Sequence, residues 1–442
     1  MAMHWDRLIS DLRFGMEDYI EHRSEIRSDF QRDYDRLIFS SSFRRLQNKT
    51  QVFPLPGSIF VHNRLTHSLE VAGVGRSIAT EVAKTLMSKY SGEPWTDKLM
   101  SLSEIVAAAC LAHDLGNPPF GHSGEKCIGT FFSEGQGQEL AREFSREQWL
   151  DLINFEGNAN SLRLLTHSFN GRRRGGFAMT YSMLASIVKY PFSSAYAGTK
   201  GKFGFFTSER ESYARIAEHL GLLSLGPDRY ARHPLVYIVE AADDICYQIM
   251  DIEDAHKLKI LSTREAIELL LGFFDYHRQE HITGVMQNIG DKNEKIAYLR
   301  SCVIGELVKE AAAAFLTGEQ EMLAGTYTGC IIDHIGEQAR RGYEACTRVA
   351  YSKIYCAANV VDIELAGNRI ITFLMEKLIE AVRYPERNYS QLLLNKFPEQ
   401  YEVNAPTLFG KIQAVIDHVS GMTDVYALDL YRKLHGMSLP AV

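Results

Sequence analysis

Two histidines and two aspartates in this chain have the donor types that a divalent metal site needs. They are His67, the adjacent pair His113 and Asp114, and Asp243. Two imidazole nitrogens and two carboxylate oxygens can close around one cation, which then activates water and neutralises phosphate oxygens. These residues are far apart in the sequence, so only the folded chain can bring them together.

The setting of the His113–Asp114 pair favours a metal site over the alternative, which is a helix-capping pair. The apolar run at residues 105–112 precedes the pair, and Gly116 follows it closely. Burying two ionisable groups next to such a run is costly unless a cation compensates. His67 alone, on a helical pattern, would more often be structural. We predict that all four residues are metal ligands.

The predicted ligand set restricts the metal. Nitrogen and carboxylate donors without thiolates suit Mn²⁺, Mg²⁺, Fe²⁺, Co²⁺ or Ni²⁺ and leave open positions for water and phosphate. The sequence does not choose among these metals. We expect one tightly held divalent metal per subunit.

His122 and Glu125 are three residues apart, which places them on one face of a helix that follows the segment NPPFG. A histidine that is held by a carboxylate suits general acid or base catalysis near neutral pH. The alternative is a surface ion pair without function. The short distance in sequence from His113 and Asp114 favours the catalytic interpretation.

Two further patterns place polar groups close to the predicted ligands. Asp243, Tyr247 and Asp251 follow at steps of four, and each step turns a helix about 40° beyond a full circle, so they share a face. A face buried in a core would be apolar, so we interpret this one as part of a site. Arg64 lies one helical turn before His67, where it can grip a phosphate with two hydrogen bonds.

The elements that must position these residues are mostly helices. Apolar residues repeat at steps of three and four over residues 65–86, 104–115 and 234–255, which is typical of helices, and Pro234 suits the first turn of the last one. Strand-like alternation is scarce. The likeliest loops include residues 53–62, in which a short hairpin is an alternative, and residues 193–208. Further helices are predicted over residues 264–288, 300–316, 329–358 and 361–383.

The composition is that of an ordinary soluble protein, and it excludes several classes. The formal net charge of −7 means that any contact with nucleic acid must be a local basic patch. Seven cysteines without a CxxC pair argue against a disulfide framework and for a reducing compartment. The N-terminal segment lacks the apolar core of a signal peptide, and no apolar run is long enough to span a membrane. We therefore expect a cytoplasmic protein with no membrane contact.

The sequences around the predicted ligands resemble those of the HD superfamily of metal-dependent phosphohydrolases. They read NRLTHSLEV around His67, LAHDLGNPPFGHSGE around His113 and EAADDICYQIMD around Asp243. They are most similar to the dGTPase-like branch, the deoxynucleoside triphosphate triphosphohydrolases. The resemblance covers roughly residues 30–260 and returns in VSGMTDVYALDLYRKLHG at residues 419–436.

The resemblance implies a mostly α fold, namely an HD-domain helical fold with additional C-terminal helices. It implies a metal-dependent phosphohydrolase core over residues 1–260 and a helical C-terminal region over residues 261–442 that packs on the core. Members of the family assemble as oligomers, often hexamers, with nucleotides at the subunit contacts. We expect a homo-oligomer on this ground alone.

The resemblance also assigns residues to a substrate, a deoxynucleoside triphosphate (dNTP). His122 and Glu125 match the catalytic pair of the family outside the metal ligands. The segment FRRLQNKTQVF resembles the nucleoside-contact segment, and its residues Gln51 and Val52 would meet the deoxyribose. Tyr247 would lie against the sugar or base, and Asp251 would accept the 3′ hydroxyl. The residues assigned to substrate binding are Arg64, Gln51, Val52, Lys189, Tyr190, Tyr247 and Asp251.

Some positions depart from the family pattern or leave alternatives open. Asn117 stands where several relatives carry His, so a second metal held by protein ligands is not expected. Phe155 stands where animal relatives place a catalytic His before Glu156, so that role is not carried over. Lys189 is also suited to the end of a helix, where the dipole favours a cation. Glu156, Asn158 and Asn160 are expected at the edge of the site, while Arg45 and Lys49 are alternatives for a neighbouring subunit or an allosteric nucleotide, and Arg172, Arg173 and Arg174 for single-stranded DNA or a regulatory nucleotide.

The implied reaction is hydrolysis of dNTPs, including dGTP, to a deoxynucleoside and inorganic triphosphate. Positioning and charge neutralisation would supply most of the rate, as in phosphoryl transfer generally. The alternatives are an HD phosphohydrolase with another nucleotide ester as substrate, and a nucleotide- or DNA-binding sensor on the same scaffold. Loss of metal ligands would mark the sensor, and none of the four is lost.

Overall fold

A computed structural model describes residues 2–18, 27–53 and 61–437 of the chain. The prediction of a mostly α fold is confirmed, because strands in the described residues are limited to one hairpin, β1 (Ser224–Gly226) and β2 (Arg229–Tyr230). The α-helices are α1 (Trp5–Leu8), α2 (Asp29–Ile38), α3 (Ser41–Arg45), α4 (Arg64–Lys89), α5 (Leu102–Ala112), α6 (Gly121–Ser133), α7 (Arg146–Ile153), α8 (Gly157–Thr166), α9 (Tyr181–Ile187), α10 (Arg210–Leu220), α11 (Pro234–Lys257), α12 (Thr263–Leu271), α13 (Tyr276–Met286), α14 (Lys292–Ala324), α15 (Glu337–Val349), α16 (Ala358–Arg383), α17 (Asn388–Leu394), α18 (Leu408–Ser420) and α19 (Asp424–Leu434).

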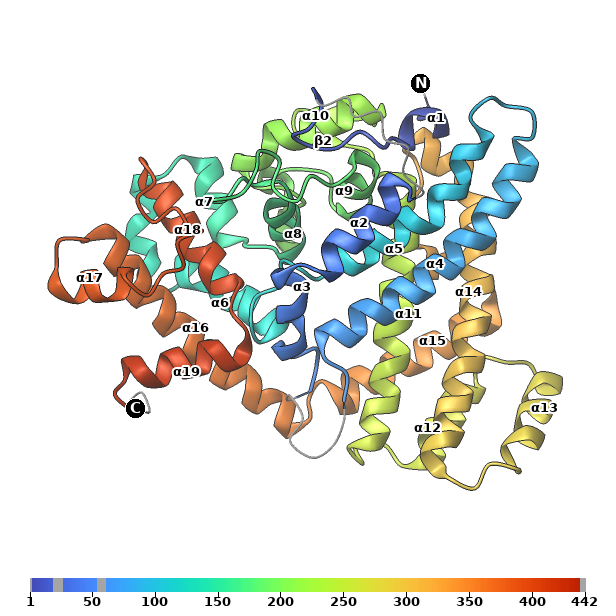
Figure 1. Ribbon diagram of the computed structural model, residues 1–442. Coiled ribbons are helices and arrows are strands. Elements are labelled where there is room, and N and C mark those ends of the chain that lie inside the picture. The colour runs from blue at the N-terminus through green and yellow to red at the C-terminus, as the bar shows by residue number, and fades with distance from the viewer. Residues whose placement is uncertain (1, 19–26, 54–60, 438–442) are drawn as a thin grey trace.

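The helices α4, α5, α11 and α14 pack against one another and form the centre of the larger hydrophobic core. Helix α5 is buried on all sides, as its continuous apolar sequence predicts. Helix α4 begins at Asn63, whose side chain forms a capping box with Thr66. Helix α11 begins with Pro234 at its first turn, as predicted, and runs diagonally past α4 (Figure 1). These three helices carry the four predicted metal ligands or end next to them.

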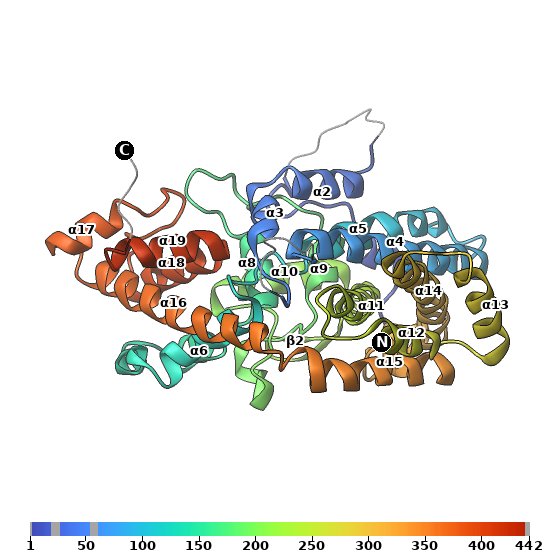
Figure 2. The same ribbon diagram turned by 90° about the horizontal axis from the view of Figure 1, so that it is seen from below.

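A second hydrophobic core lies at the other end of the molecule and joins segments that are distant in sequence. There α6 packs on α16, and α16 in turn packs on α17, α18 and α19. Both views place this group apart from α11 and α14 (Figures 1 and 2). The cores therefore do not follow chain order, since α6 lies with the C-terminal helices while α14 lies with α4. The division of the chain at residue 260 stays a prediction.

Three predicted helices differ from the observed elements for local reasons. The predicted helix 264–288 is two helices, because the chain breaks after Gly272 and Asp275 caps α13 by accepting a hydrogen bond from the backbone of Arg278. The predicted helix 300–316 extends over the whole of α14 and ends at Gly325, which has a left-handed φ of 70°. The predicted helix 329–358 contains a 3-10 turn, α15, and a π-helical turn, Ala350–Ile354.

The two predicted loops have different outcomes. Most of the segment 53–62, including its alternative hairpin, lies outside the described residues, which omit 54–60. The segment 193–208 has no long helix but contains three short 3-10 turns, and Phe203 and Phe205 in it are completely buried. This loop is therefore packed into the molecule. No helix in the part of the chain that the structure describes is long and apolar enough to cross a membrane.

Candidate active site

Three of the four predicted ligands converge where α4, the end of α5 and the middle of α11 meet. The Nε2 atom of His67 lies 3.0 Å from Oδ1 of Asp243, and Nε2 of His113 lies 3.5 Å from the same oxygen. One donor atom from each of these residues lies within 4.8 Å of the others, which is a spacing that can hold a metal ion. The helices that contribute them are separated in sequence but packed in contact.

His113 has the arrangement of an imidazole that is ready to bind a metal. Its Nδ1 lies 2.6 Å from the carbonyl oxygen of Cys110, to which it donates, so Nε2 is the nitrogen that can bind a metal once it carries no proton. Among the described residues, the buried Nε2 atom has no hydrogen-bond partner. Burial lowers the pKa of His113, but the Asp114 and Asp243 carboxylates more than offset this and raise it to about 9. The surroundings therefore favour positive charge at this point, and the residues fit a divalent cation.

Asp114 lies next to this group but directs its oxygens elsewhere. Its Oδ2 accepts a hydrogen bond from Arg64 at 2.6 Å, and its Oδ1 accepts one from the side chain of Asn117. Oδ1 is also 3.6 Å from Nε2 of His113. Burial raises the pKa of Asp114, but Arg64 and His113 outweigh it and the pKa is lowered, so this carboxylate is charged. Its role as a metal ligand stays a prediction.

Arg64 connects the ligand group to the loop that precedes α6. The side chain is buried, and its Nε atom has no hydrogen-bond partner among the described residues. A Cβ atom at Gly121 would lie 2.9 Å from Nη2 of Arg64, and Gly121 has a left-handed φ of 61°. Only glycine lets the backbone approach this guanidinium so closely. The predicted contact of Arg64 with a phosphate stays a prediction.

His122 and Glu125 form the predicted pair at the start of α6. Nδ1 of His122 lies 3.1 Å from Oε2 of Glu125, and the carboxylate is buried while 68% of the imidazole is exposed. The hydrogen bond to Glu125 raises the pKa of His122. Burial raises the pKa of Glu125, but His122 outweighs this and lowers it. The pair thus presents an exposed imidazole whose protonated form is favoured by the hydrogen bond to Glu125.

Lys202 joins this pair, although it was not predicted from the sequence. Its Nζ atom lies 3.7 Å from Oε2 of Glu125 and 2.6 Å from Oε2 of Glu156. A single lysine in a glycine-containing loop has no periodic pattern, so its position depends on how the segment 193–208 packs. The two carboxylates raise the pKa of Lys202 despite its partial burial, which lowers it. A cation is thereby held next to the candidate acid–base pair.

The start of α8 lies next to the site and carries three polar residues, Glu156, Asn158 and Asn160. Glu156 caps α8 and accepts hydrogen bonds from the backbone and side chain of Asn158. The side chain of Asn160 donates to the carbonyl oxygen of Gly116 at 2.7 Å. The contact of Asn160 holds the backbone two residues after Asp114.

The far end of the predicted polar face on α11 has a partner that was not predicted. Tyr355 donates a hydrogen bond from its hydroxyl to Oδ2 of Asp251 at 2.8 Å, and its ring lies 6.0 Å from that of Tyr247. Burial raises the pKa of Asp251 to about 8. Tyr355 directly follows the π-helical turn 350–354, and such turns are frequent at functional sites. Tyr247 and Asp251 share a face as expected, and the aromatic run YSKIY was the only signal for Tyr355.

Lys189 and Tyr190 lie in a separate cationic group. Nζ of Lys189 is 3.0 Å from Glu240, which also pairs with Arg232 at 2.9 Å. Both cations lie 5.8 Å from the centre of the Tyr190 ring. Burial lowers the pKa of Lys189, but Glu240 and the more distant Asp243 contribute to raising it. The group is thus within electrostatic reach of the ligand cluster, and Arg232 was missed from the sequence.

The segment before α4 carries Gln51 and Val52 and lies near the start of α6. Oε1 of Gln51 is buried without a hydrogen-bond partner in the described part of the chain. The backbone oxygen of Gln51 would lie 3.7 Å from a Cβ atom at Gly121, so this segment faces the start of α6. Val52 is half-buried against the larger core. Their predicted contact with a deoxyribose stays a prediction.

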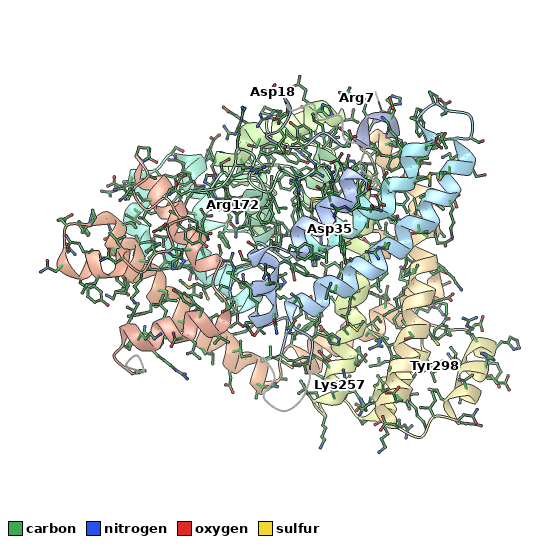
Figure 3. The ribbon with its side chains drawn as sticks, in the orientation of Figure 1. Arg7, Asp18, Asp35, Arg172, Lys257 and Tyr298 are labelled. Carbon is green, nitrogen blue, oxygen red and sulfur yellow. The ribbon has the colours of Figure 1, made fainter. Side chains whose placement is uncertain are left out.

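The remaining basic residues occupy different environments. Arg172, labelled in Figure 3, stacks its guanidinium on Phe177 at 4.5 Å and on Phe169 at 5.3 Å, while Arg173 and Arg174 are exposed. Lys49 is buried inside the molecule. A lysine at this depth is not placed where a neighbouring subunit would reach it.

Comparisons with known proteins place the chain among phosphohydrolases. The family model of the HD domain matches residues 64–186, and that of the phosphohydrolase-associated domain matches residues 334–433. A deoxyguanosinetriphosphate triphosphohydrolase-like protein of Pseudomonas aeruginosa is 36% identical over 99% of this chain and its own full length. A protein of the same name from Synechocystis is 35% identical over the same shares. A deoxyguanosinetriphosphate triphosphohydrolase of Salmonella arizonae is 29% identical over 98% of this chain and 97% of its own.

Proposed function

Because this chain belongs to the deoxyguanosinetriphosphate triphosphohydrolase-like family of HD-domain phosphohydrolases, we propose that it hydrolyses dNTPs to a deoxynucleoside and inorganic triphosphate. The observation that carries the proposal is the grouping of His67, His113 and Asp243 next to Arg64. A divalent metal held by these ligands, with Asp114 as the fourth, would supply a Lewis acid next to phosphate oxygens and an activated water. The relatives are named for dGTP, so dGTP is the first substrate to test.

Arg64 would bind and orient the triphosphate. Its buried guanidinium donates to Asp114 through Nη1, and its Nε has no partner in the described residues. The charged Asp114 keeps the guanidinium plane fixed. An arginine fixed in this way can offer further N–H groups to phosphate oxygens without reorganising. Lys189, Lys202 and Arg232 would add positive charge along the path of the phosphates.

The pair His122 and Glu125 would handle the proton of the leaving group. Water attacks the α-phosphorus, the bond from phosphorus to the 5′ oxygen breaks, and that oxygen takes up a proton. His122 is suited to donate it, because Glu125 raises its pKa and its Nε2 faces solvent. The products are then a deoxynucleoside with a 5′ hydroxyl and triphosphate.

Tyr247, Asp251 and Tyr355 would bind the nucleoside end. The hydroxyl of Tyr355 already donates to Asp251, whose pKa is raised to about 8. A carboxyl group that is neutral in the free protein can exchange this partner for a 3′ hydroxyl without leaving a buried charge unpaired. Gln51 and Val52 would pack under the 2′ carbon, which favours deoxy over ribo substrates.

The test is product analysis of the purified chain with Mn²⁺ or Mg²⁺, with each of the four dNTPs and with GTP. We expect a deoxynucleoside and triphosphate in one step, and little turnover of GTP. A monophosphate or diphosphate product would contradict the proposal and favour another phosphohydrolase. Binding of a dNTP without turnover, also with mixed nucleotides as activators, would favour the sensor.

The family resemblance also suggests an oligomeric state and a cellular location. We propose a cytoplasmic homo-oligomer, a hexamer by family resemblance, in which an activating nucleotide or single-stranded DNA can bind at subunit contacts. Light scattering of the purified chain with and without dNTPs tests the oligomer. A monomer under both conditions would contradict it.

A further inference from the structure

The loop Gly116–Gly121 links the ligand cluster to the acid–base pair but has little structure of its own. Phe120 and Gly121 both have left-handed φ angles, 63° and 61°. For a non-glycine residue such as Phe120 this conformation is strained. The loop lies between Asp114 and His122, so a shift in it would move either residue. Its conformation must therefore be held by contacts from other segments.

Asp424, the first residue of α19, provides two of these contacts. Its Oδ1 accepts a hydrogen bond from the backbone N–H of Phe120 at 3.0 Å, and its Oδ2 accepts one from Thr50 at 2.9 Å. An aspartate at this position usually serves its own helix, but Thr423 already caps α19 through the backbone of Tyr426. Both oxygens of the buried Asp424 are directed at other segments instead.

Lys49 provides a second tie between the same parts of the molecule. Its ammonium group is buried and donates to the carbonyl oxygen of Asn117 at 2.5 Å and to that of Ser420 at 2.8 Å. Burying an ammonium is costly, and an apolar side chain of similar volume would fill this space without that cost. Burial lowers the pKa of Lys49 to about 7. The lysine is best explained by what its N–H groups hold.

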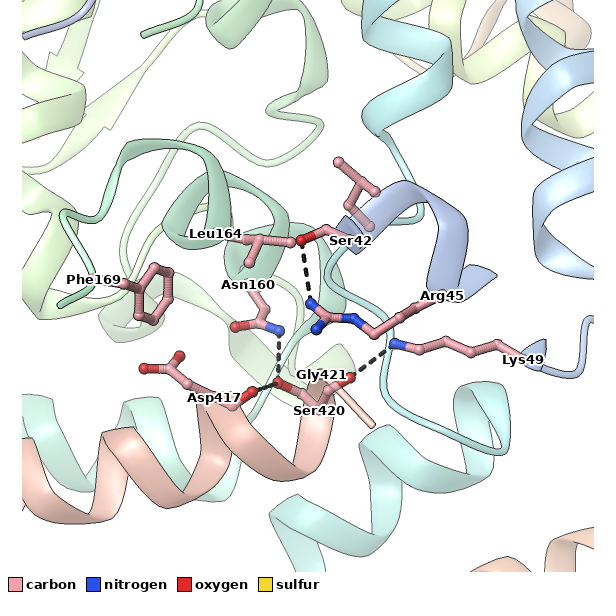
Figure 4. A pocket seen from close by; sticks show the side chains of 10 residues that line it. Ser42, Arg45, Lys49, Asn160, Leu164, Phe169, Asp417, Ser420 and Gly421 are labelled. Carbon is pink, nitrogen blue, oxygen red and sulfur yellow. Dashed lines mark hydrogen bonds between the residues drawn. The ribbon is translucent and has the colours of Figure 1, made fainter. Parts of the chain in front are cut away.

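Asn160 completes the connection. Its side chain donates both to the carbonyl oxygen of Gly116 and, at 3.1 Å, to the hydroxyl of Ser420. Figure 4 shows Lys49 and Asn160 reaching the end of α18 from opposite sides of a small cavity. The loop is thus tied to the α18–α19 corner at Gly116, Asn117 and Phe120.

We propose that Lys49 and Asp424 form a clamp: they are positioning residues through which the C-terminal helices set the conformation of the loop Gly116–Gly121. This loop carries the Asn117 amide that binds Asp114, and it places Gly121 against Arg64. The phosphohydrolase-associated region, residues 334–433, would then act on the site through Ser420 and Asp424. The inference rests on the proposed function only for the activity that it affects.

The first test is hydrogen exchange of the full-length chain and of Asp424→Asn. The amide replaces one acceptor oxygen by a donor, so one of the two N–H groups loses its partner. We expect exchange at Thr50 or Phe120 to accelerate by about tenfold or more, which corresponds to the loss of one hydrogen bond to a charged group. Asp429→Asn is the matched control, because Asp429 lies on the same helix, has a side chain that is 47% exposed and pairs with Lys433. Unchanged exchange in Asp424→Asn would overturn the proposal, whether or not dNTPs are hydrolysed.

The second test separates positioning from folding. Lys49→Met keeps the volume without the ammonium, and Lys49→Arg keeps a donor. For the methionine variant we expect kcat on dGTP to fall about 10- to 100-fold while KM changes less than about threefold, with partial recovery in the arginine variant. The double variant Lys49→Met, Asp424→Asn should lose less than the two single losses combined, since both act on one loop.

The outcomes distinguish this inference from the proposed function. Full activity in Lys49→Met and Asp424→Asn, with wild-type exchange, would overturn the clamp and leave the proposed reaction intact. Absence of dNTP hydrolysis in the wild type would overturn the reaction, and the exchange of Thr50 and Phe120 would still decide the clamp. If Lys49→Met does not fold, thermal unfolding will show it, and the near-isosteric Asp424→Asn decides alone.

Discussion

Two aspartates on one face of α11 have opposite electrostatic states. Asp243 is surrounded by the imidazoles of His67 and His113, and although burial raises its pKa these groups bring it well below the ordinary value. Asp251 lies two turns further along the helix, where burial raises its pKa to about 8 and the main partner is the neutral hydroxyl of Tyr355.

This difference shows that the helix alone does not determine the protonation state of its carboxylates. Residue type, helix and face are the same, so the elements that pack on α11 make the difference. At one end α4 and α5 bring nitrogen bases, and at the other the segment after α15 brings an aromatic hydroxyl. The end at Asp243, the charged end, can hold a cation, and the end at Asp251, the neutral end, can accept a neutral hydroxyl group.

The largest expected effect comes from breaking the charged end. His113→Ala or Asp243→Ala should lower kcat on dGTP by at least about a thousandfold, because each removes a proposed metal ligand. Bound Mn²⁺, measured by metal analysis after gel filtration, should fall in parallel. A variant that keeps both metal and activity would contradict the assignment.

Breaking the neutral end should have a smaller effect that leaves the metal in place. Asp251→Asn should lower kcat/KM for dNTPs by about 10- to 100-fold, which is the loss of one strong hydrogen bond to substrate. We expect the loss mainly in KM, with wild-type Mn²⁺ content. Loss of metal in this variant would show that the two ends are not independent.

The pH dependence of stability should also separate the ends. Between pH 4 and pH 8 the folded protein keeps a proton on Asp251 that the unfolded chain releases, so this residue lowers the free energy of unfolding as pH rises. Asp251→Asn should therefore gain stability relative to the wild type from pH 5 to pH 8. Chemical denaturation of metal-free protein at several pH values measures this. A constant difference between wild type and Asp251→Asn would contradict the neutral state.

The smallest effect is expected for Tyr355→Phe. This change removes one hydroxyl and leaves Oδ2 of Asp251 without its donor, which should cost about 1–2 kcal/mol of stability. Thermal unfolding measures the loss. Tyr351→Phe is the control, because Tyr351 is exposed on the same turn. Equal stability of the two variants would mean that the hydrogen bond contributes little.

The sequence allowed much of the fold and the charged end to be predicted, but less of the rest. The periodicity of α4, α5 and α11 is strong because each helix buries a continuous face. The sequence motifs around His67, His113 and Asp243 are specific to the family. The break at Gly272 was missed because the apolar pattern continues across it. Tyr355 and Lys202 act through contacts between distant segments, and no local pattern reports such contacts. Lys49 was considered for a neighbouring subunit or an allosteric nucleotide, but the structure buries it, and no local pattern in the sequence reports this burial.

The hydrogen bonds from Lys49 to Ser420 and from Phe120 and Thr50 to Asp424 also have a consequence for how the protein is made. Translation proceeds from the N-terminus, so a ribosome completes His67, His113, His122 and Asp243 well before it adds the α18–α19 corner. A nascent chain at that stage has all its ligands but lacks the partners that hold the loop between them. If the clamp acts as proposed, hydrolysis begins only after the α18–α19 corner has been added, and chains that lack this corner do not consume nucleotides.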